Sequence, residues 1–277
     1  MDKKTDTQVP IGIDGIAFSI PRGYVSLTDL AEARGVPAAK YLNGLGTHAM
    51  AVAGPEEDPV TLAVNAARRL FQRSGRSPAE IGLCIVGTET AVDHSKPIAA
   101  FVHGQLGLPS ACRSYETKHA CFGGTAGLMT ALDWIAAGTA RGAKNAAPRV
   151  ALIICSDIAR YPLGSAGEPT QGAGAVAFIV SERPRLVELE VARTGSYTRD
   201  VHDFWRPLDR KDALTDGHFS VQCYLDALAG AYQSWQQVAG GGAELVRTCY
   251  HVPYGKMARK AHRHRKQLDG LTEAAAD

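Results

Sequence analysis

Residues 118–130, KHACFGGTAGLMT, decide how the rest of the chain is interpreted. Cys121 stands in this stretch just before a long apolar run, and a short strand-like segment, residues 111–115, leads into it. We predict a strand, a tight turn and a buried helix that carries Cys121 at or near its first turn. Backbone N–H groups and the positive end of the helix dipole gather at such a turn, and both favour a thiolate over a thiol. The alternative is a structural cysteine in a core helix, because cysteine is among the most buried residue types.

Three glycines follow Cys121 within the same stretch: Gly123, Gly124 and Gly127. A glycine has no side chain, so another backbone or a substrate can approach it closely. Together with the reactive side chains found elsewhere in the chain, the glycines favour a functional cysteine over a structural one.

The composition of the 277 residues is that of a globular protein, with 45% hydrophobic and 21% charged residues. A net charge of +2 is too small to indicate nucleic acid as the main partner. No apolar run reaches membrane-spanning length, and the polar N-terminal tail, residues 1–9, has no apolar signal core. The six cysteines show neither metal-ligand spacing nor a paired framework, which predicts reduced thiols, no metal and a cytoplasmic protein. Cys84, Cys155 and Cys249 lie in apolar strand-like runs, so we expect them to be buried.

Strand-like and helical patterns alternate along the chain. The central series is strand 81–87, helix 95–106, strand 111–115, helix 121–137 and strand 149–155. Such alternation is typical of a mainly parallel sheet with helices on both faces, so the expected fold class is α/β. The other predicted elements are strands at 11–20, 173–180, 186–191 and 245–251 and helices at 26–34, 61–74 and 220–237.

Two further reactive side chains stand at the ends of predicted strands. Glu89 lies in VGTETAVDHSK, directly after the apolar run 81–87. His251 lies in CYHVPYGKM, where Pro253 ends another apolar run. Active sites of open α/β sheets lie at the carboxyl ends of strands, so Glu89 and Cys121 are placed to meet there. Taken singly, the two side chains are also compatible with a loop glutamate and a structural histidine.

These residue types suit thioester chemistry. A thiolate beside a histidine is both a good nucleophile and a tolerable leaving group, which suggests acyl-thioester formation on Cys121. An added carboxylate suits carbon–carbon bond formation, because a base must take a proton from the carbon next to a thioester carbonyl while donors hold the oxyanion. Desolvation at a strand end would raise the pKa of Glu89 into the range of a general acid or base.

The segment that begins at Lys256 has helical periodicity with two distinct faces. One face carries Lys256, Arg259, Lys260 and Arg263, and the other carries Met257, Ala258, Ala261 and Leu268. The pattern fits a helix that faces the phosphates of a nucleotide-containing cofactor. A solvated basic face is the alternative.

Six blocks, in order, resemble the hydroxymethylglutaryl-CoA synthase family of the thiolase superfamily: VGTETAVDHSK, KHACFGGTAGL, SDIARYPLGSAGEPTQGAGAVA, HDFWRPL, DGHFSVQCYLDAL and CYHVPYGKMARKAH. The resemblance implies a thiolase-like layered fold of helices and mostly parallel mixed sheets over residues 10–277, following the polar tail. It implies an N-terminal half of about 10–182 and a C-terminal half of about 183–277. The second half is expected to be incomplete, because the family's chains run beyond the position of Asp277.

The resemblance also implies a reaction. Acetyl-CoA acylates Cys121, Glu89 takes a proton from the acetyl methyl group, and the carbanion attacks the ketone of acetoacetyl-CoA. His251 polarises or protonates the ketone oxygen, and water releases the product from Cys121. Both CoA thioesters are substrates, and no permanently bound cofactor is implied. The positions that match CoA-contacting residues of the family are Ser220, Thr170, Lys256 and Lys260.

Several alternatives remain open from sequence alone. The leading interpretation is a synthase of the mevalonate route that acts as a homodimer. A related synthase that builds β-branches on polyketides held by acyl carrier protein shares the Cys121 block. A ketoacyl-synthase-type enzyme would leave Glu89 without a role. A different class is a half-enzyme or non-catalytic subunit that needs a second chain to complete it.

Overall fold

The computed structural model describes residues 9–140, 149–239 and 245–271. Residues 1–8 of the predicted polar tail lie outside the described residues. The chain forms two compact units. Of the described residues, the first contains 9–23, 53–140, 149–158 and 173–191, and the second contains 24–52, 159–172, 192–239 and 245–271.

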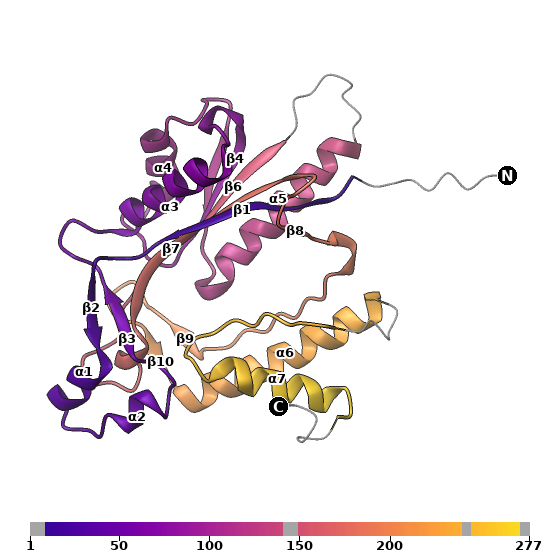
Figure 1. The fold of residues 1–277 in the computed structure, drawn as a ribbon. Coiled ribbons are helices and arrows are strands. Elements are labelled where there is room, and N and C mark those ends of the chain that lie inside the picture. Colours follow the sequence, from indigo (N-terminus) through magenta and orange to yellow (C-terminus); the bar gives the residue numbers. More distant parts are fainter. Residues whose placement is uncertain (1–8, 141–148, 240–244, 272–277) are drawn as a thin grey trace. The chain divides into compact units, whose positions relative to one another are not determined.

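A six-stranded mixed sheet forms the first unit, in the order β5-β4-β6-β7-β1-β8 (Figure 1). Strand β4 runs parallel to both β5 and β6, whereas β1 pairs antiparallel with β7 and β8. The strands are β1 (Ile11–Ser19), β4 (Ile81–Gly87), β5 (Arg113–Thr117), β6 (Val150–Ala159), β7 (Gly172–Glu182) and β8 (Val187–Glu188). The α/β alternation predicted from sequence is therefore confirmed.

Helices cover both faces of this sheet. Helices α3 (Pro59–Ser74) and α4 (Ile98–Leu106) lie on one face, and α5 (Gly123–Ala140) lies on the other (Figure 1). Strand β4 divides its side chains between them, since Cys84 and Val86 join the α3/α4 core while Leu83 and Ile85 join the α5 core. Burial on both faces explains why β4 is apolar without interruption.

Sequence signals at both ends fix the extent of α3. The Asp58 side chain accepts a hydrogen bond from Thr61 N at 2.7 Å, and Thr61 Oγ1 accepts one from Asp58 N at 2.8 Å. This reciprocal capping box satisfies backbone donors that the first turn leaves without helical partners. Gly75 ends the helix in the left-handed region, with φ of 71°.

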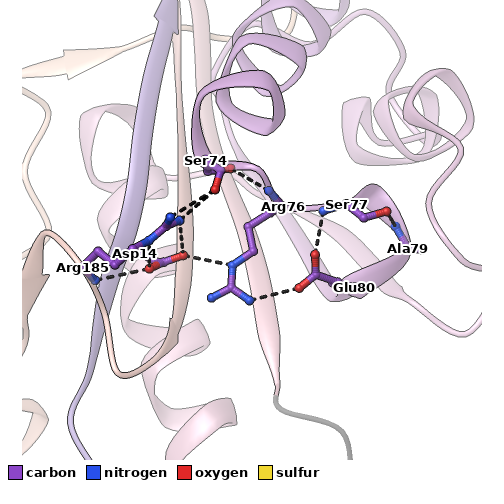
Figure 2. A network of polar contacts seen from close by, with 7 residues as sticks. All are labelled: Asp14, Ser74, Arg76, Ser77, Ala79, Glu80 and Arg185. Carbon is purple, nitrogen blue, oxygen red and sulfur yellow. Dashed lines mark hydrogen bonds and ion pairs between the residues drawn. The ribbon is translucent and has the colours of Figure 1, made fainter.

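A buried carboxylate ties β1 to the loops beside it (Figure 2). Asp14 lies at a register shift in β1 and accepts hydrogen bonds from Arg76 Nε at 3.0 Å and Arg185 Nε at 2.7 Å. Arg185 also donates to the Ser74 carbonyl at 3.1 Å, and Arg76 pairs with Glu80 at 3.0 Å. Burial alone would raise the pKa of the Asp14 carboxyl, but the hydrogen bonds and charges of Arg185 and Arg76 outweigh it and lower that pKa.

The second unit is mainly helical. Its elements include α1 (Leu27–Ala33), α2 (Ala39–Leu42), α6 (Gly217–Ala239) and α7 (Met257–Leu268), with short strand pairs β2 (Gly23–Ser26) with β3 (Ala49–Val52) and β9 (Phe204–Trp205) with β10 (Leu214–Thr215). A small core of Leu27, Leu30, Tyr41 and Met50 packs α1 and α2. None of the 23 residues of α6 is buried.

One predicted strand is wrong. Residues 245–251 form no strand in the structure, and Val246 is 84% exposed. A strand needs a neighbour for its backbone hydrogen bonds, and the described part of the chain offers this segment none. Cys249, predicted to be buried, is consequently exposed. The predicted edge strand 186–191 is shortened to Val187–Glu188.

Candidate active site

Cys121 lies in a short 3₁₀ turn, Ala120–Phe122, directly before the first residue of α5. The position at the start of a helix is the one predicted from sequence, and Cys121 is exposed. Ala120 has a φ of +36°, a value that L-residues rarely adopt. Phe122 N and Gly123 N both donate to the His119 carbonyl, at 2.8 and 3.1 Å. The hydrogen bonds hold the strained residue immediately before the cysteine.

Close packing explains the glycines beside this turn. A Cβ on Gly124 would stand 2.1 Å from Cys155 Sγ, and a Cβ on Gly87 would stand 2.3 Å from Gly124 N. No side chain fits at either contact, so the end of β4 lies against the first turn of α5. A Cβ on Gly123 would stand 2.9 Å from the Thr117 carbonyl oxygen, so the predicted close approach of another backbone is confirmed at Gly123.

The Glu89 loop follows β4 and is held by a carboxylate on the neighbouring strand. Asp157, near the end of β6, accepts hydrogen bonds at one oxygen from Thr88 Oγ1 at 2.9 Å, Glu89 N at 2.8 Å and Thr90 Oγ1 at 2.9 Å. Burial raises the pKa of Asp157, and the donated hydrogen bonds offset part of that rise. Asp157 is a residue that sequence reasoning missed, although an aspartate at a strand end in SDIAR carried the same signal as Glu89.

Backbone contacts join the Glu89 loop to the Cys121 turn. Thr88 N donates to Thr117 O at 3.2 Å, and Thr117 Oγ1 donates to Gly123 O at 2.7 Å. Gly87 and Thr117 are register partners in the parallel pair β4/β5. The first unit therefore brings the segments that carry Glu89 and Cys121 together at the carboxyl end of the sheet.

The neighbouring cysteines differ from Cys121 in burial. Burial raises the pKa of the Cys84 thiol to about 12 and that of Cys155 to about 11, with Asp157 adding to the second shift. Both groups therefore stay protonated at neutral pH. Cys121, exposed at a helix start, is the cysteine of this sheet end whose position suits a nucleophile.

His251 belongs to the second unit and lies in the segment between α6 and α7. Tyr224 Oη donates to the His251 carbonyl at 2.9 Å, and the two rings stack with centroids 6.2 Å apart. The histidine keeps an exposed surface, but the surrounding atoms desolvate its imidazole and lower its pKa. A neutral ring therefore predominates at pH 7.

The residues predicted to contact CoA all lie in the second unit. Lys256 is the N-cap residue of α7, and Lys260 Nζ donates to Tyr254 Oη at 3.0 Å. Ser220 Oγ, on α6, donates to Asp203 Oδ2 at 3.2 Å. Thr170 lies in the short helix η3 (Glu168–Thr170), where its hydroxyl donates to Gly167 O at 2.7 Å.

The two predicted faces of α7 agree with burial. Met257 and Ala261 are buried, while Lys256, Arg259, Lys260 and Arg263 are exposed. Sequence reasoning missed Arg265, which is 5% exposed and pairs with Asp269 at 2.8 Å.

Sequence reasoning also missed Glu168, a buried residue of η3. Glu168 is 2% exposed and accepts hydrogen bonds from Arg34 Nε at 2.8 Å and Gly164 N at 2.8 Å. The hydrogen bond from Arg34 is the main reason that the pKa of Glu168 is lowered. The pair ties the end of α1 to the loop that carries Thr170.

The layered sheet, with a cysteine at the start of a covering helix, matches the thiolase-like α/β fold. The family model for the N-terminal part of hydroxymethylglutaryl-coenzyme A synthase matches residues 7–184, and the model for the C-terminal part matches residues 187–274. The chain therefore belongs to the hydroxymethylglutaryl-coenzyme A synthase family.

Three relatives place the chain within that family. Hydroxymethylglutaryl-CoA synthase of Enterococcus faecalis is 38% identical over 91% of this chain and 63% of its own length. Polyketide biosynthesis 3-hydroxy-3-methylglutaryl-ACP synthase PksG of Bacillus subtilis (strain 168) is 34% identical over 92% of this chain and 62% of its own length. A structure of MvaS in complex with 3-hydroxy-3-methylglutaryl coenzyme A is 50% identical, with a TM-score of 0.89, over 98% of this chain and 66% of that chain. The chain thus spans less than two thirds of each of these relatives.

Within the described ranges, no helix has the length and apolar character needed to cross a membrane.

Proposed function

We propose that the protein is an acyltransferase that condenses acetyl-CoA with acetoacetyl-CoA and releases hydroxymethylglutaryl-CoA and CoA, on the mevalonate route. One observation carries the proposal: the Glu89 loop and the Cys121 turn are joined through Thr117 at one end of the sheet. The similarity to the synthases of E. faecalis and to MvaS supports the choice of substrates.

In the first step, the Cys121 sulfur attacks the thioester carbonyl of acetyl-CoA. The new bond joins sulfur to the acetyl carbon, and CoA leaves as its thiol after taking up the proton that Cys121 gave up. Exposure of Cys121 and its place at a helix start support this role.

In the second step, the Glu89 carboxylate takes a proton from the acetyl methyl group. The carbanion bonds to the ketone carbon of acetoacetyl-CoA, and the ketone oxygen becomes an alkoxide that is then protonated. His251, as a neutral imidazole, polarises that oxygen by donating its N–H. Water finally cleaves the thioester, which restores the Cys121 thiol and leaves a free carboxylate on the product.

We assign the CoA part of the substrates to residues of the second unit. Lys256 and Lys260 supply positive charge for phosphates, and Ser220 and Thr170 supply hydroxyl groups. Attraction between lysine ammonium groups and phosphate is the physical basis of this assignment.

The decisive experiment separates the two steps. Glu89→Ala is expected to keep covalent acetylation of Cys121, seen by intact-protein mass, and to lose condensation with acetoacetyl-CoA by a factor of roughly 10² to 10⁴. Glu89→Gln, which keeps the size of the side chain without its basicity, should behave alike. Condensation at the wild-type rate in either variant would remove Glu89 from the mechanism.

The similarity to PksG favours one further candidate, a synthase that uses a β-ketoacyl group on an acyl carrier protein. Steady-state rates with free acetoacetyl-CoA and with the carrier-bound acceptor distinguish the two. Saturation by the free thioester at low concentration supports the CoA-using enzyme.

We also propose that the protein is a cytoplasmic homodimer. Its chain is divided into an N-terminal half, residues 10–182, and a C-terminal half, residues 183–277. A second polypeptide completes the C-terminal half. The boundary between the two family models, at residues 184 and 187, supports the division. The exposed segment 245–251 supports the additional polypeptide, because its apolar pattern suits a paired strand.

A further inference from the structure

We propose that Glu116 is a positioning residue that fixes the Glu89 loop relative to Cys121 by capping helix α4. The inference rests on the function proposed above.

Helix α4 has no cap of its own. Its N-cap residue is Pro97, which makes no side-chain capping hydrogen bond. The missing acceptor comes from strand β5, where Glu116 Oε2 accepts a hydrogen bond from Ile98 N at 2.7 Å. Ser114, two residues earlier on β5, donates from Oγ to Ala99 O at 3.0 Å. A carboxylate at a helix N-terminus also interacts favourably with the helix dipole.

The loop between β4 and α4 is thus held at both ends by carboxylates from the two strands that flank β4. Asp157 on β6 binds the start of the loop through Glu89 N, and Glu116 on β5 binds its end through Ile98 N. Between these anchors, residues 91–96 are exposed. Asp93 accepts local hydrogen bonds there from Ser95 N and Lys96 N at 2.7 Å.

Glu116 also lies on the strand that leads to the nucleophile. The next residue, Thr117, accepts from Thr88 N and donates to Gly123 O beside the Cys121 turn. One segment of β5 therefore contacts the start of the loop, the end of the loop and the first residue of α5. Loss of Glu116 releases the far end of the loop while the other two contacts stay in place.

The first measurement is amide hydrogen exchange, which needs no activity. In Glu116→Ala, exchange of residues 91–98 is expected to rise about tenfold or more, because the Ile98 amide loses its acceptor. Asp58→Ala is the matched control, since it removes an equivalent carboxylate cap from α3. It should loosen the first turn of α3 and leave residues 91–98 unchanged. Unchanged exchange in Glu116→Ala would overturn the proposal.

The second measurement follows chemistry on the acetylated protein in deuterated water. Glu116→Ala is expected to accept an acetyl group on Cys121 within about twofold of the wild-type rate, and to exchange acetyl methyl protons about tenfold more slowly, because the loop that carries the base is then held at its start only. Glu116→Gln keeps an acceptor oxygen for Ile98 N and should restore the exchange of acetyl methyl protons to near the wild-type rate. Equal losses in acetylation and proton exchange, matched by Asp58→Ala, would indicate a merely structural role and overturn the proposal.

The two measurements separate the two claims. If the wild-type chain takes no acetyl group, the proposed function fails, while amide exchange still decides whether Glu116 holds the loop.

Discussion

Cys121, directly before α5, and Cys155, on β6 beside the first turn of α5, show how position decides thiol chemistry. Cys155 packs its sulfur against the backbone of Gly124, and burial raises its pKa to about 11. Cys121, three residues before Gly124 in sequence, lies in the exposed turn after the strained Ala120. The same helix start thus has a protected thiol behind it and an accessible one at its tip.

We predict that Cys121→Ala abolishes covalent acetylation by acetyl-CoA. Intact-protein mass should show one acetyl group on the wild-type chain and none on the variant, because the nucleophilic sulfur is absent. Cys249→Ala is the control, since Cys249 is also exposed but lies in the second unit. Acetylation that survives in Cys121→Ala and disappears in Cys249→Ala would show that Cys249, and not Cys121, is the nucleophile.

At the scale of single residues, the sequence predicted the reactive residues that follow strands. It did not predict the residues whose hydrogen bonds hold those reactive residues in place. Glu89 and Cys121 were found because each stands next to a short apolar run. Asp157 was missed because its role depends on contacts with Thr88 and Glu89, which are 69 and 68 positions away in the sequence. The positive φ of Ala120 has no sequence signal, since such a conformation is ordinarily marked by glycine or asparagine.

Strand β1 contains a buried charge, Asp14. Asp14→Ala should destabilise the protein by about 2–4 kcal/mol, because Arg76 and Arg185 lose their shared acceptor. Glu80→Ala removes a partly exposed partner of Arg76 and should lower the free energy of unfolding by about 1 kcal/mol or less. Urea unfolding of both variants at pH 7 gives the comparison. Equal losses would contradict a special role for Asp14.

The same carboxylate predicts a pH dependence. The pKa of Asp14 in the folded protein is below its ordinary value of 3.8, so the folded state binds its proton less readily than the unfolded state. The stabilisation is therefore complete above about pH 4 and is lost as pH falls through the folded pKa. Between pH 5 and pH 2, stability should fall more steeply for the wild type than for Asp14→Ala, measured by urea midpoints. Parallel slopes would mean that Asp14 does not contribute to acid sensitivity.

Helix α7 leads to a prediction about binding. Lys256→Ala should weaken binding of acyl-CoA, and the loss should be larger at low salt, because mobile ions screen the attraction between ammonium and phosphate. Isothermal titration at two salt concentrations measures it. Lys40→Ala on α2, another exposed lysine of the second unit, is the control and should have little effect. Unchanged affinity in Lys256→Ala would make the basic face of α7 a solvated surface.

Element prediction succeeded where local pattern and tertiary context agree. The runs 81–87 and 173–180 became buried strands because helices or neighbouring strands cover them. The run 245–251 has a comparable apolar pattern, yet it forms no strand. Periodicity reports what a segment can bury, whereas a strand also requires a partner that the local sequence does not encode.

At the scale of the whole molecule, the chain matches only part of the length of its relatives. Some apolar side chains of the described residues are exposed. The chain spans 63% of the E. faecalis synthase. In the second unit, α6 has no buried residue despite the apolar side chains along it, and Val246 is 84% exposed. Exposed apolar side chains such as Val246 suit a surface that further polypeptide can cover.

We therefore predict that a polypeptide corresponding to the unmatched part of the E. faecalis synthase binds this chain when the two are produced together. Pairing with residues 245–251 should slow amide exchange there, because the backbone gains a ladder partner. Condensation should rise in the same samples, since His251 ends that segment. Val246→Asp should weaken the complex, whereas Leu208→Asp, at a residue 89% exposed in a loop of the same unit, should not. If exchange at 245–251 stays fast in the mixture, the segment is not a docking strand and its apolar residues need another explanation.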